Sequence, residues 1–183
     1  MQRTLQPVSS GPAPVSAVRS RTASWHDPVA ASERGRLLSG LDHLLAMQRG
    51  EIPPPPIMAL LGFELVEAEE CRAVFACEPG EHLYNPIGSV HGGVAATLLD
   101  SATGCAVHTT LPPGVGYTTL DLHVTYVRAI TRDAGRITAE GRVLHAGRRI
   151  ATAEGRLLDG DDRLLAHATA SCVILQPEPG ARD

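Results

Sequence analysis

The segment that decides the fold of this 183-residue chain is residues 85–100, which reads NPIGSVHGGVAATLLD. A turn-rich sequence ends here, and an Ala- and Leu-rich stretch without proline runs from about His91 to about Leu111. A stretch of this length and composition predicts one long helix. The helix would begin with the pair Gly92 and Gly93, each of which costs about 1 kcal/mol relative to alanine in a helix.

Segments on both sides of this helix have the pattern of β-strands. Two short ones precede it and four follow it, and turn signals containing Gly or Asp separate the last four. Strands joined by short turns are expected to be antiparallel neighbours. Because strands and helices do not alternate, the order predicts an α+β fold in which a single antiparallel sheet wraps one long central helix. The predicted strands are 62–68, 72–77, 116–129, 135–146, 149–159 and 163–175.

The first 56 residues have a different character. Residues 1–32 are rich in Ser, Pro, Ala and Arg and poor in large aliphatic side chains, which predicts a flexible tail, although this acid-poor composition also fits a mitochondrial presequence. Leucines at helical spacing between Ser32 and Gly50 predict an additional amphipathic helix, and the prolines at 53–56 predict an extended linker. The predicted organisation is a tail over 1–32, a helix and linker over 33–56, a compact domain over 57–176 and a C-terminal tail over 177–183.

The composition argues against several classes of function. The net charge is −4 and the 16 basic residues are all arginines scattered along the chain, so no nucleic-acid partner is expected. No apolar run of about 18 residues and no secretory signal is present, so we expect a cytoplasmic protein without a membrane partner. The histidines and the four cysteines lack the spacing of a metal site, and the cysteines are expected to be buried free thiols.

Two features of the 85–100 segment point to chemistry. Glycines at the start of a helix allow close approach to free backbone N–H groups, where the helix dipole places about half a positive charge, so an oxyanion could bind there. Asp100, on an otherwise apolar face of the same helix, is costly to bury unless it has a function. Close packing of the glycines on a strand, and an Asp100 bonded to neighbouring backbone, are the structural alternatives.

The spacing of these two features predicts a dimer. Seven residues separate Gly93 from Asp100, which places them on nearly the same helix face but about 10 Å apart along the axis. A reacting carbonyl must lie about 3 Å from both its oxyanion donor and its nucleophile or base, so one chain cannot supply both groups to one substrate. If both act, Asp100 must face the Gly92–Gly93 turn of a second subunit, and two equivalent sites form across a twofold axis.

The sequence resembles the hotdog-fold thioesterase superfamily, and within it the phenylacetic-acid-degradation (PaaI-like) branch. The motif of that branch is an Asn, a Gly, a His-Gly-Gly and, seven positions later, an acidic residue, which correspond here to Asn85, Gly88, residues 91–93 and Asp100. The resemblance covers about residues 57–175 and includes the strand TTLDLHVTY at 118–126. It implies an acyl-CoA thioesterase for an aryl or short to medium acyl group, active as a homodimer or homotetramer, without a cofactor other than the CoA of the substrate.

The resemblance also implies roles for individual residues. Asp100 is expected to act as the nucleophile or general base, and the Gly92 amide to polarise the thioester carbonyl. Asn85 is expected to position the carbonyl or a water molecule, and His91 to orient the loop or to bond near the carbonyl. Thr119 is expected to help hold the attacking water.

Further substrate contacts are expected from Gly88 and Gly93, the other motif glycines. Arg148 and Arg149, at the tip of a predicted hairpin, could meet the phosphates of CoA, although a solvated turn also explains them. Gly104 departs from a related aromatic-acyl branch, which has Thr one turn after its acid, so the acyl group stays open. Two alternative functions also stay open: a non-catalytic acyl-CoA-binding module, and a hotdog dehydratase, which would need a paired Asp and His.

Overall fold

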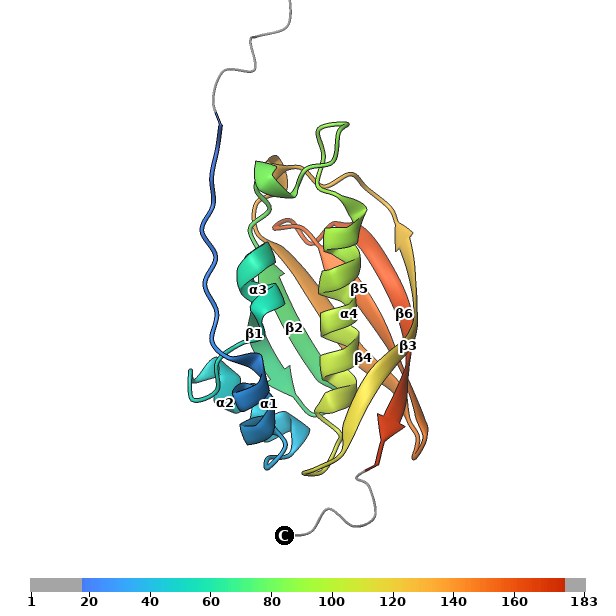
Figure 1. Ribbon diagram of the computed structural model, residues 1–183. Coiled ribbons are helices and arrows are strands. Elements are labelled where there is room, and N and C mark those ends of the chain that lie inside the picture. Colours follow the sequence, from blue (N-terminus) through green and yellow to red (C-terminus); the bar gives the residue numbers. More distant parts are fainter. Residues whose placement is uncertain (1–17, 177–183) are drawn as a thin grey trace, which may run out of the picture.

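One antiparallel sheet of six strands curves around the long helix α4, Gly92–His108 (Figure 1). The computed structural model describes residues 18–176, so the parts of the predicted tails at 1–17 and 177–183 lie outside the described residues. The α+β hotdog architecture is confirmed, and every predicted strand has a counterpart. The strands are β1 Phe63–Glu69, β2 Arg72–Cys77, β3 Gly116–Tyr126, β4 Ile137–Ala146, β5 Ile150–Leu158 and β6 Leu164–Leu175.

Strand β3 lies at an edge of the sheet, beside β6. The strand order is β1-β2-β4-β5-β6-β3, and all neighbouring strands are antiparallel. The prediction that β3 and β4 are neighbours is therefore wrong. The reason is that residues 127–136 form a crossing connection instead of a tight turn: the Val127 and Arg128 N–H groups donate to the Leu165 carbonyl, and the chain then turns through the 3₁₀ helix Arg132–Ala134.

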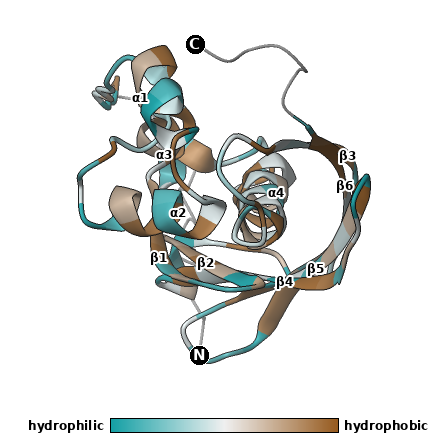
Figure 2. Cartoon of the chain, turned by 90° about the horizontal axis from the view of Figure 1, so that it is seen from below, coloured by the Kyte–Doolittle hydropathy of each residue, from teal (hydrophilic) through white to brown (hydrophobic). Residues whose placement is uncertain are grey.

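The core lies between α4 and the concave face of the sheet (Figure 2). Close approach of the helix depends on Gly141 of β4, because a Cβ at this position would lie 2.2 Å from the Ala102 carbonyl oxygen. Burial of each large aliphatic or aromatic side chain contributes about 1.5–3 kcal/mol, so this packing fixes the position of α4 along its length. The large side chains fully buried in this layer include Phe75, Leu98, Leu99, Ile137 and Leu157.

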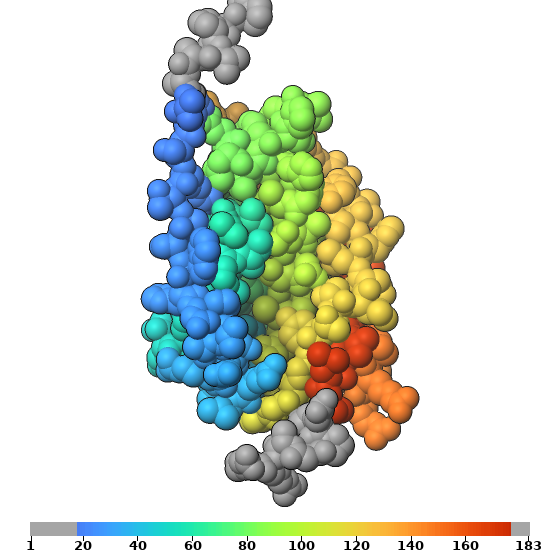
Figure 3. Space-filling view, viewed as in Figure 1, coloured from blue at the N-terminus to red at the C-terminus, as the bar shows by residue number. Residues whose placement is uncertain are grey.

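Three short helices precede the sheet in the chain: α1 Pro28–Gly35, α2 Gly40–Gln48 and α3 Pro56–Leu61. Figure 3 shows the segment from residue 18 through α2 lying along one side of the molecule. The prediction of a single helix between Ser32 and Gly50 is wrong, because α1 starts earlier and the helical segment breaks before α2.

A tertiary contact with the end of α4 explains the break. The Gly40 N–H donates a 2.9 Å hydrogen bond to the Leu111 carbonyl instead of continuing α1, and a Cβ at Gly40 would lie 1.7 Å from the His108 carbonyl oxygen. Ser39 caps the new helix by accepting a hydrogen bond from the Asp42 N–H. Helix α2 is therefore anchored to the C-terminal end of α4.

Two further expectations concern the described residues. No helix between residues 18 and 176 is long and apolar enough to cross a membrane. The prediction of buried thiols holds for Cys77 and Cys172 but is wrong for Cys71, which is exposed with a φ of +65° in the tight turn between β1 and β2. Cys105, on α4, is partly exposed.

Candidate active site

His91 caps the N-terminus of α4. Its Nδ1 accepts a 2.9 Å hydrogen bond from the Gly93 N–H, and its carbonyl accepts one of 2.9 Å from the Val94 N–H. The Gly92 N–H has no acceptor within the described part of the chain. Of the two glycine amides expected at the substrate, only that of Gly92 is therefore free, and it lies at the positive end of the helix dipole.

Asn85 closes the loop that leads into the helix. Its side-chain oxygen accepts hydrogen bonds from the N–H groups of Ile87 and Ser89, at 3.0 and 3.3 Å, and its amide nitrogen donates to the Ser89 hydroxyl at 3.1 Å. Gly88 has a φ of +81°, a conformation that favours glycine. These contacts fix the loop, and one hydrogen of the Asn85 amide remains for another partner.

Tyr126, at the end of β3, covers the first turn of α4. Its hydroxyl donates a 3.0 Å hydrogen bond to the Gly92 carbonyl, and a Cβ at Gly92 would lie 3.2 Å from the ring. A cavity of about 280 Å³ opens here, lined by Gly92, Tyr126 and Arg128 among others. Neither Tyr126 nor Arg128 was predicted from the sequence to have a role; the only signal was the place of Tyr126 at the end of the motif strand 118–126.

Asp100 lies half-buried near the middle of α4 and contacts β3. Its carboxylate accepts a 2.8 Å hydrogen bond from the Thr119 hydroxyl. Asp100 forms no ion pair with any residue between 18 and 176. Two residues expected from sequence to share a site are thus in direct contact, and one oxygen of the carboxylate has no protein donor among the described residues.

A β-bulge at Leu120 explains why Thr119 faces the helix. Thr119 pairs with Cys172 and Asp121 with Ser171, so Leu120 is an extra residue without a partner in β6. Strand alternation changes phase at this point: the inward-facing positions are odd-numbered before the bulge and even-numbered after it. Asp121 and His123 are consequently exposed on the other face.

The two halves of the predicted site lie on one continuous helix. Helix α4 runs without interruption from Gly92 to His108, so seven residues of helix place Gly93 about 10 Å from Asp100 along the axis. The Gly92 amide and the Asp100 carboxylate of one chain therefore cannot both contact one carbonyl group. His91 lies farther away, nine residues before Asp100, and its Nδ1 is occupied by the helix cap, which does not favour an Asp–His acid–base pair within the chain.

The expected CoA contacts Arg148 and Arg149 lie in the exposed turn between β4 and β5. This turn is at the opposite end of the sheet from Gly92, because the Arg149 carbonyl accepts from the Ile174 N–H near the end of β6. The structure does not bring the two arginines together with the N-terminus of α4 in the same chain. Arg128, in contrast, borders that end.

The sequence is similar to those of known thioesterases and esterases. A family model described as the thioesterase superfamily matches residues 87–166. A relative from Halobacterium salinarum, which carries a provisional esterase name, is 37% identical over 137 residues that make up 72% of this chain and 89% of the relative. The 1,4-dihydroxy-2-naphthoyl-CoA hydrolase of Listeria monocytogenes is 27% identical over 114 residues, 62% of this chain and 91% of that enzyme.

Solved structures agree with this assignment. A phenylacetic acid degradation-related protein from Ralstonia eutropha JMP134 is 30% identical, and the match covers 71% of this chain and 98% of that chain with a TM-score of 0.65. A thioesterase from Haemophilus influenzae, 18% identical, matches 80% of this chain and 99% of its own with a TM-score of 0.66, which supports the fold alone. The chain therefore belongs to the thioesterase superfamily, close to its phenylacetic-acid-degradation branch, and is a thioester hydrolase with the hotdog fold.

Proposed function

We propose that the protein hydrolyses acyl-CoA thioesters to a free acid and CoA in a homodimer, and that each active site combines the Gly92 amide of one subunit with Asp100 of the other. The observation that carries this proposal is the Asp100 carboxylate, which Thr119 binds and which has no ion pair among residues 18–176. It lies on the same uninterrupted helix as the Gly92 amide, which has no acceptor among those residues. Both groups have the chemistry of a thioesterase, and one chain cannot bring them to the same substrate. The substrate in the name of the Listeria relative, an aromatic acyl-CoA, supports CoA thioesters as the substrate class.

The free edge of β3 supports the dimer. Among the described strands, β3 pairs only with β6, so its other edge has unpaired backbone N–H and C=O groups. An exposed strand edge is a template for pairing with a second chain. Pairing across a twofold axis would bring the α4 helices of two subunits side by side, with opposite directions, which is the arrangement that the proposed site needs.

The proposed reaction begins with the thioester carbonyl at the Gly92 N–H. Asp100 either removes a proton from water, which then attacks the carbonyl carbon, or attacks this carbon itself to form an anhydride that water cleaves. In both cases a C–O bond forms, the oxyanion accepts a hydrogen bond from Gly92, and the C–S bond then breaks to release the CoA thiolate. One oxyanion donor typically lowers the barrier by about 3 kcal/mol.

Other residues support this reaction in defined ways. Thr119 holds the Asp100 carboxylate through its hydroxyl, and His91 and Asn85 hold the helix entrance. Gly88 permits the loop conformation. The proposed reaction uses no cofactor, and CoA enters it only as part of the substrate. Arg148 and Arg149, which lie far from Gly92 of their own chain, are proposed as CoA contacts only for a site that two subunits share.

The experiment that tests the function is thiol release from short, medium, long and aryl acyl-CoAs by wild type, Asp100→Ala and Asp100→Asn. Asparagine keeps the shape and the contact with Thr119 but cannot act as nucleophile or base. We expect both variants to lose about 100-fold or more in kcat with unchanged melting temperature. Turnover within a few-fold of wild type in both variants would contradict the role of Asp100.

A further inference from the structure

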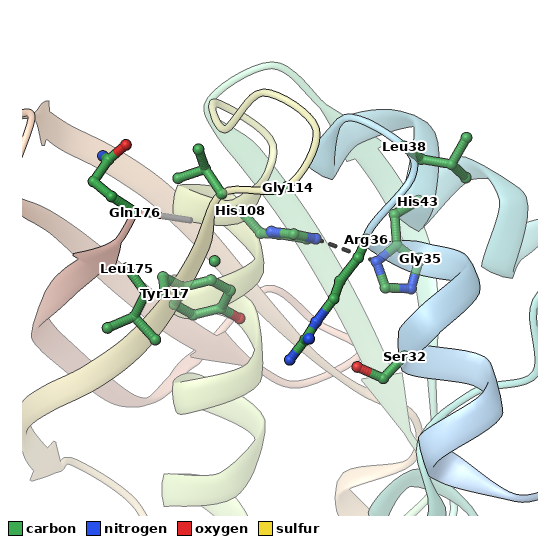
Figure 4. A pocket seen from close by; sticks show the side chains of 12 residues that line it. Ser32, Gly35, Arg36, Leu38, His43, His108, Gly114, Tyr117, Leu175 and Gln176 are labelled. Atoms are coloured by element: carbon green, nitrogen blue, oxygen red, sulfur yellow. Dashed lines mark hydrogen bonds between the residues drawn. The ribbon is translucent and has the colours of Figure 1, made fainter. Parts of the chain in front are cut away.

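Two tyrosines of β3 pack against glycines of α4, one in the second half of the helix and one in its first turn. A Cβ at Gly104 would lie 2.8 Å from the Tyr117 ring, and a Cβ at Gly92 would lie 3.2 Å from the Tyr126 ring. Tyr117 lines a cleft of about 780 Å³ at the C-terminal end of α4, as Figure 4 shows. Tyr126 lies at the opposite end, against the turn that carries the Gly92 amide. One strand therefore contacts both ends of the helix.

The bulge at Leu120 allows both tyrosines to face the helix. Tyr117 and Tyr126 are nine residues apart, and an odd separation places two side chains on opposite faces of a regular strand. The extra residue in β3 reverses this alternation, so Tyr126 lies on the same face as Thr119 and Tyr117. Because Tyr126 pairs with Ala166 of β6, its backbone is held at the end of the strand. The bulge thus brings β3 side chains to both halves of the proposed site.

One peptide group in the first turn of α4 is held at both ends by side chains. It joins Gly92 to Gly93: its N–H donates a 2.9 Å hydrogen bond to His91 Nδ1, and its carbonyl accepts one of 3.0 Å from the Tyr126 hydroxyl. Glycine allows many backbone conformations, so a turn with two glycines depends on such contacts to keep one orientation. His91 is a neighbour in the chain, whereas Tyr126 ties this peptide group to the sheet.

The preceding peptide group carries the N–H that is proposed to bind the oxyanion. This group joins His91 to Gly92, and its carbonyl accepts a 2.9 Å hydrogen bond from the Val94 N–H, while its N–H has no acceptor between residues 18 and 176. Peptide groups are planar, so the angle between the two groups depends on the backbone torsions of Gly92 alone. A contact that fixes the second group therefore limits the directions in which the Gly92 N–H can point.

We infer that Tyr126 is a positioning residue, whose hydroxyl holds the Gly92–Gly93 peptide group so that the Gly92 N–H stays directed at the thioester oxyanion. A donor that is already oriented stabilises a transition state best, because no reorganisation is needed during the reaction. The Tyr126 side chain is 54% exposed, so loss of its hydroxyl should affect the orientation of the turn more than the stability of the protein. The inference rests on the proposed function, since it assumes that the Gly92 amide binds the oxyanion.

The first test measures kcat and KM for thiol release by wild type and Tyr126→Phe. Phenylalanine keeps the ring that packs on Gly92 and removes only the hydroxyl. We expect kcat to fall about 5- to 10-fold, with KM within about 2-fold of wild type and an unchanged melting temperature. Thr125→Val removes an exposed hydroxyl from the other face of β3 and should keep the wild-type kcat. An unchanged kcat in Tyr126→Phe would overturn the inference.

A double-mutant cycle tests whether Tyr126 acts through the Gly92 amide. Gly92→Pro removes this N–H and Gly92→Ala keeps it, so Tyr126→Phe is combined with each. We expect Tyr126→Phe to lower kcat about 5- to 10-fold in Gly92→Ala and less than about 2-fold in Gly92→Pro, where no N–H remains to be oriented. Equal losses in both backgrounds, with Gly92→Pro itself impaired, would contradict the inference and leave the proposed role of Gly92 standing.

Amide hydrogen exchange tests the geometry without turnover. NMR follows the Gly93 N–H, which belongs to the held peptide group, and the N–H of the buried Leu98 as a control. We expect Tyr126→Phe to speed exchange at Gly93 about 5-fold or more and to leave Leu98 unchanged. A Gly93 exchange rate equal to that of wild type would overturn the inference whatever the kinetics. Faster exchange at Gly93, combined with a Gly92→Pro enzyme as active as Gly92→Ala, would uphold the contact but contradict the proposed role of Gly92, and with it the purpose of the contact.

Discussion

The two ends of helix α4 differ in what surrounds them. At the N-terminal end, a loop fixed by Asn85 leaves the Gly92 amide without an acceptor among residues 18–176, and the group proposed to act there belongs to the backbone. At the C-terminal end, α1 and α2 cover the helix, and the residues that line a cavity of about 250 Å³ there include no Asp, Glu, Lys or Arg. Asp100 lies between the two environments. The difference indicates that the proposed reaction depends on a short local motif, whereas the surroundings of the C-terminal end depend on α1 and α2, which come from elsewhere in the chain.

The largest effect on activity is expected when the Gly92 N–H at the N-terminal end of α4 is removed. Gly92→Pro deletes the N–H at the first helical position, where proline is tolerated, and His91 already has the extended backbone that precedes proline, with a ψ of 133°. Gly92→Ala introduces a similar Cβ beside Tyr126 but retains the N–H. We expect kcat of Gly92→Pro to fall about 100-fold below that of Gly92→Ala in a thiol-release assay. Equal rates in the two folded variants would show that this amide does not stabilise the oxyanion.

The next prediction tests the packing that holds both ends in place. A Cβ at Gly141 would press against the Ala102 carbonyl in the middle of α4, so Gly141→Ala should lower the free energy of unfolding by about 1–3 kcal/mol. The melting temperature would fall by about 2–4 °C per kcal/mol. Gly160→Ala, in the β5–β6 turn, is the control, because its nearest atoms would be 3.8 Å or more from the new Cβ. A Gly141→Ala protein as stable as Gly160→Ala would contradict the close helix–sheet contact.

A smaller effect is expected at the C-terminal end of α4, where His108 should make the free energy of unfolding depend on pH. Burial lowers the pKa of His108 from 6.5 to about 4, so the unfolded chain binds more protons than the folded one between these values. Stability is therefore fully present above about pH 6.5 and declines as the pH falls toward 4, by about 1–2 kcal/mol at pH 5. Urea unfolding at pH 7.5 and 5 measures this decline. His108→Gln should show less of it, and an equal decline in His108→Gln and wild type would contradict the assignment to His108.

The smallest effect concerns the contact that joins Asp100 to β3. Thr119→Val keeps the size of the side chain and removes the hydrogen bond to the carboxylate, so we expect a loss of about 3- to 10-fold in kcat. Thr118→Val, at the exposed neighbouring position, serves as the control in the same assay. A loss shared by both variants would point to the strand and not to this hydrogen bond.

Local signals explain what the sequence could predict. Short turns marked the strand boundaries, and a proline-free Ala- and Leu-rich stretch marked α4, because both depend on neighbouring residues. The placement of β3 at the edge beside β6 and the break between α1 and α2 could not be predicted in this way. The first depends on the path of a ten-residue connection, and the second on the contact of Gly40 with Leu111 across the molecule.

The same distinction applies to the site. The motif residues from Asn85 to Asp100 lie in one short segment, so their spacing could be recognised in the sequence. The resemblance of the strand 118–126 predicted a role for Thr119 in holding the attacking water, but not its hydrogen bond to Asp100. The bulge at Leu120 leaves no clear mark in the sequence. The residues around the cavity at the C-terminal end of α4 come from separate elements, and only folding brings His43, Tyr117 and His108 together.

The measurement that tests the central proposal most directly is complementation between two inactive variants. Asp100→Ala and Gly92→Pro chains are mixed under conditions of subunit exchange and assayed for thiol release, with each variant alone as the control. A site shared between subunits predicts that each mixed dimer has one intact site, so an equal mixture should recover about a quarter of wild-type activity. A mixture that contains mixed dimers but has no more activity than the separate variants would contradict the shared site.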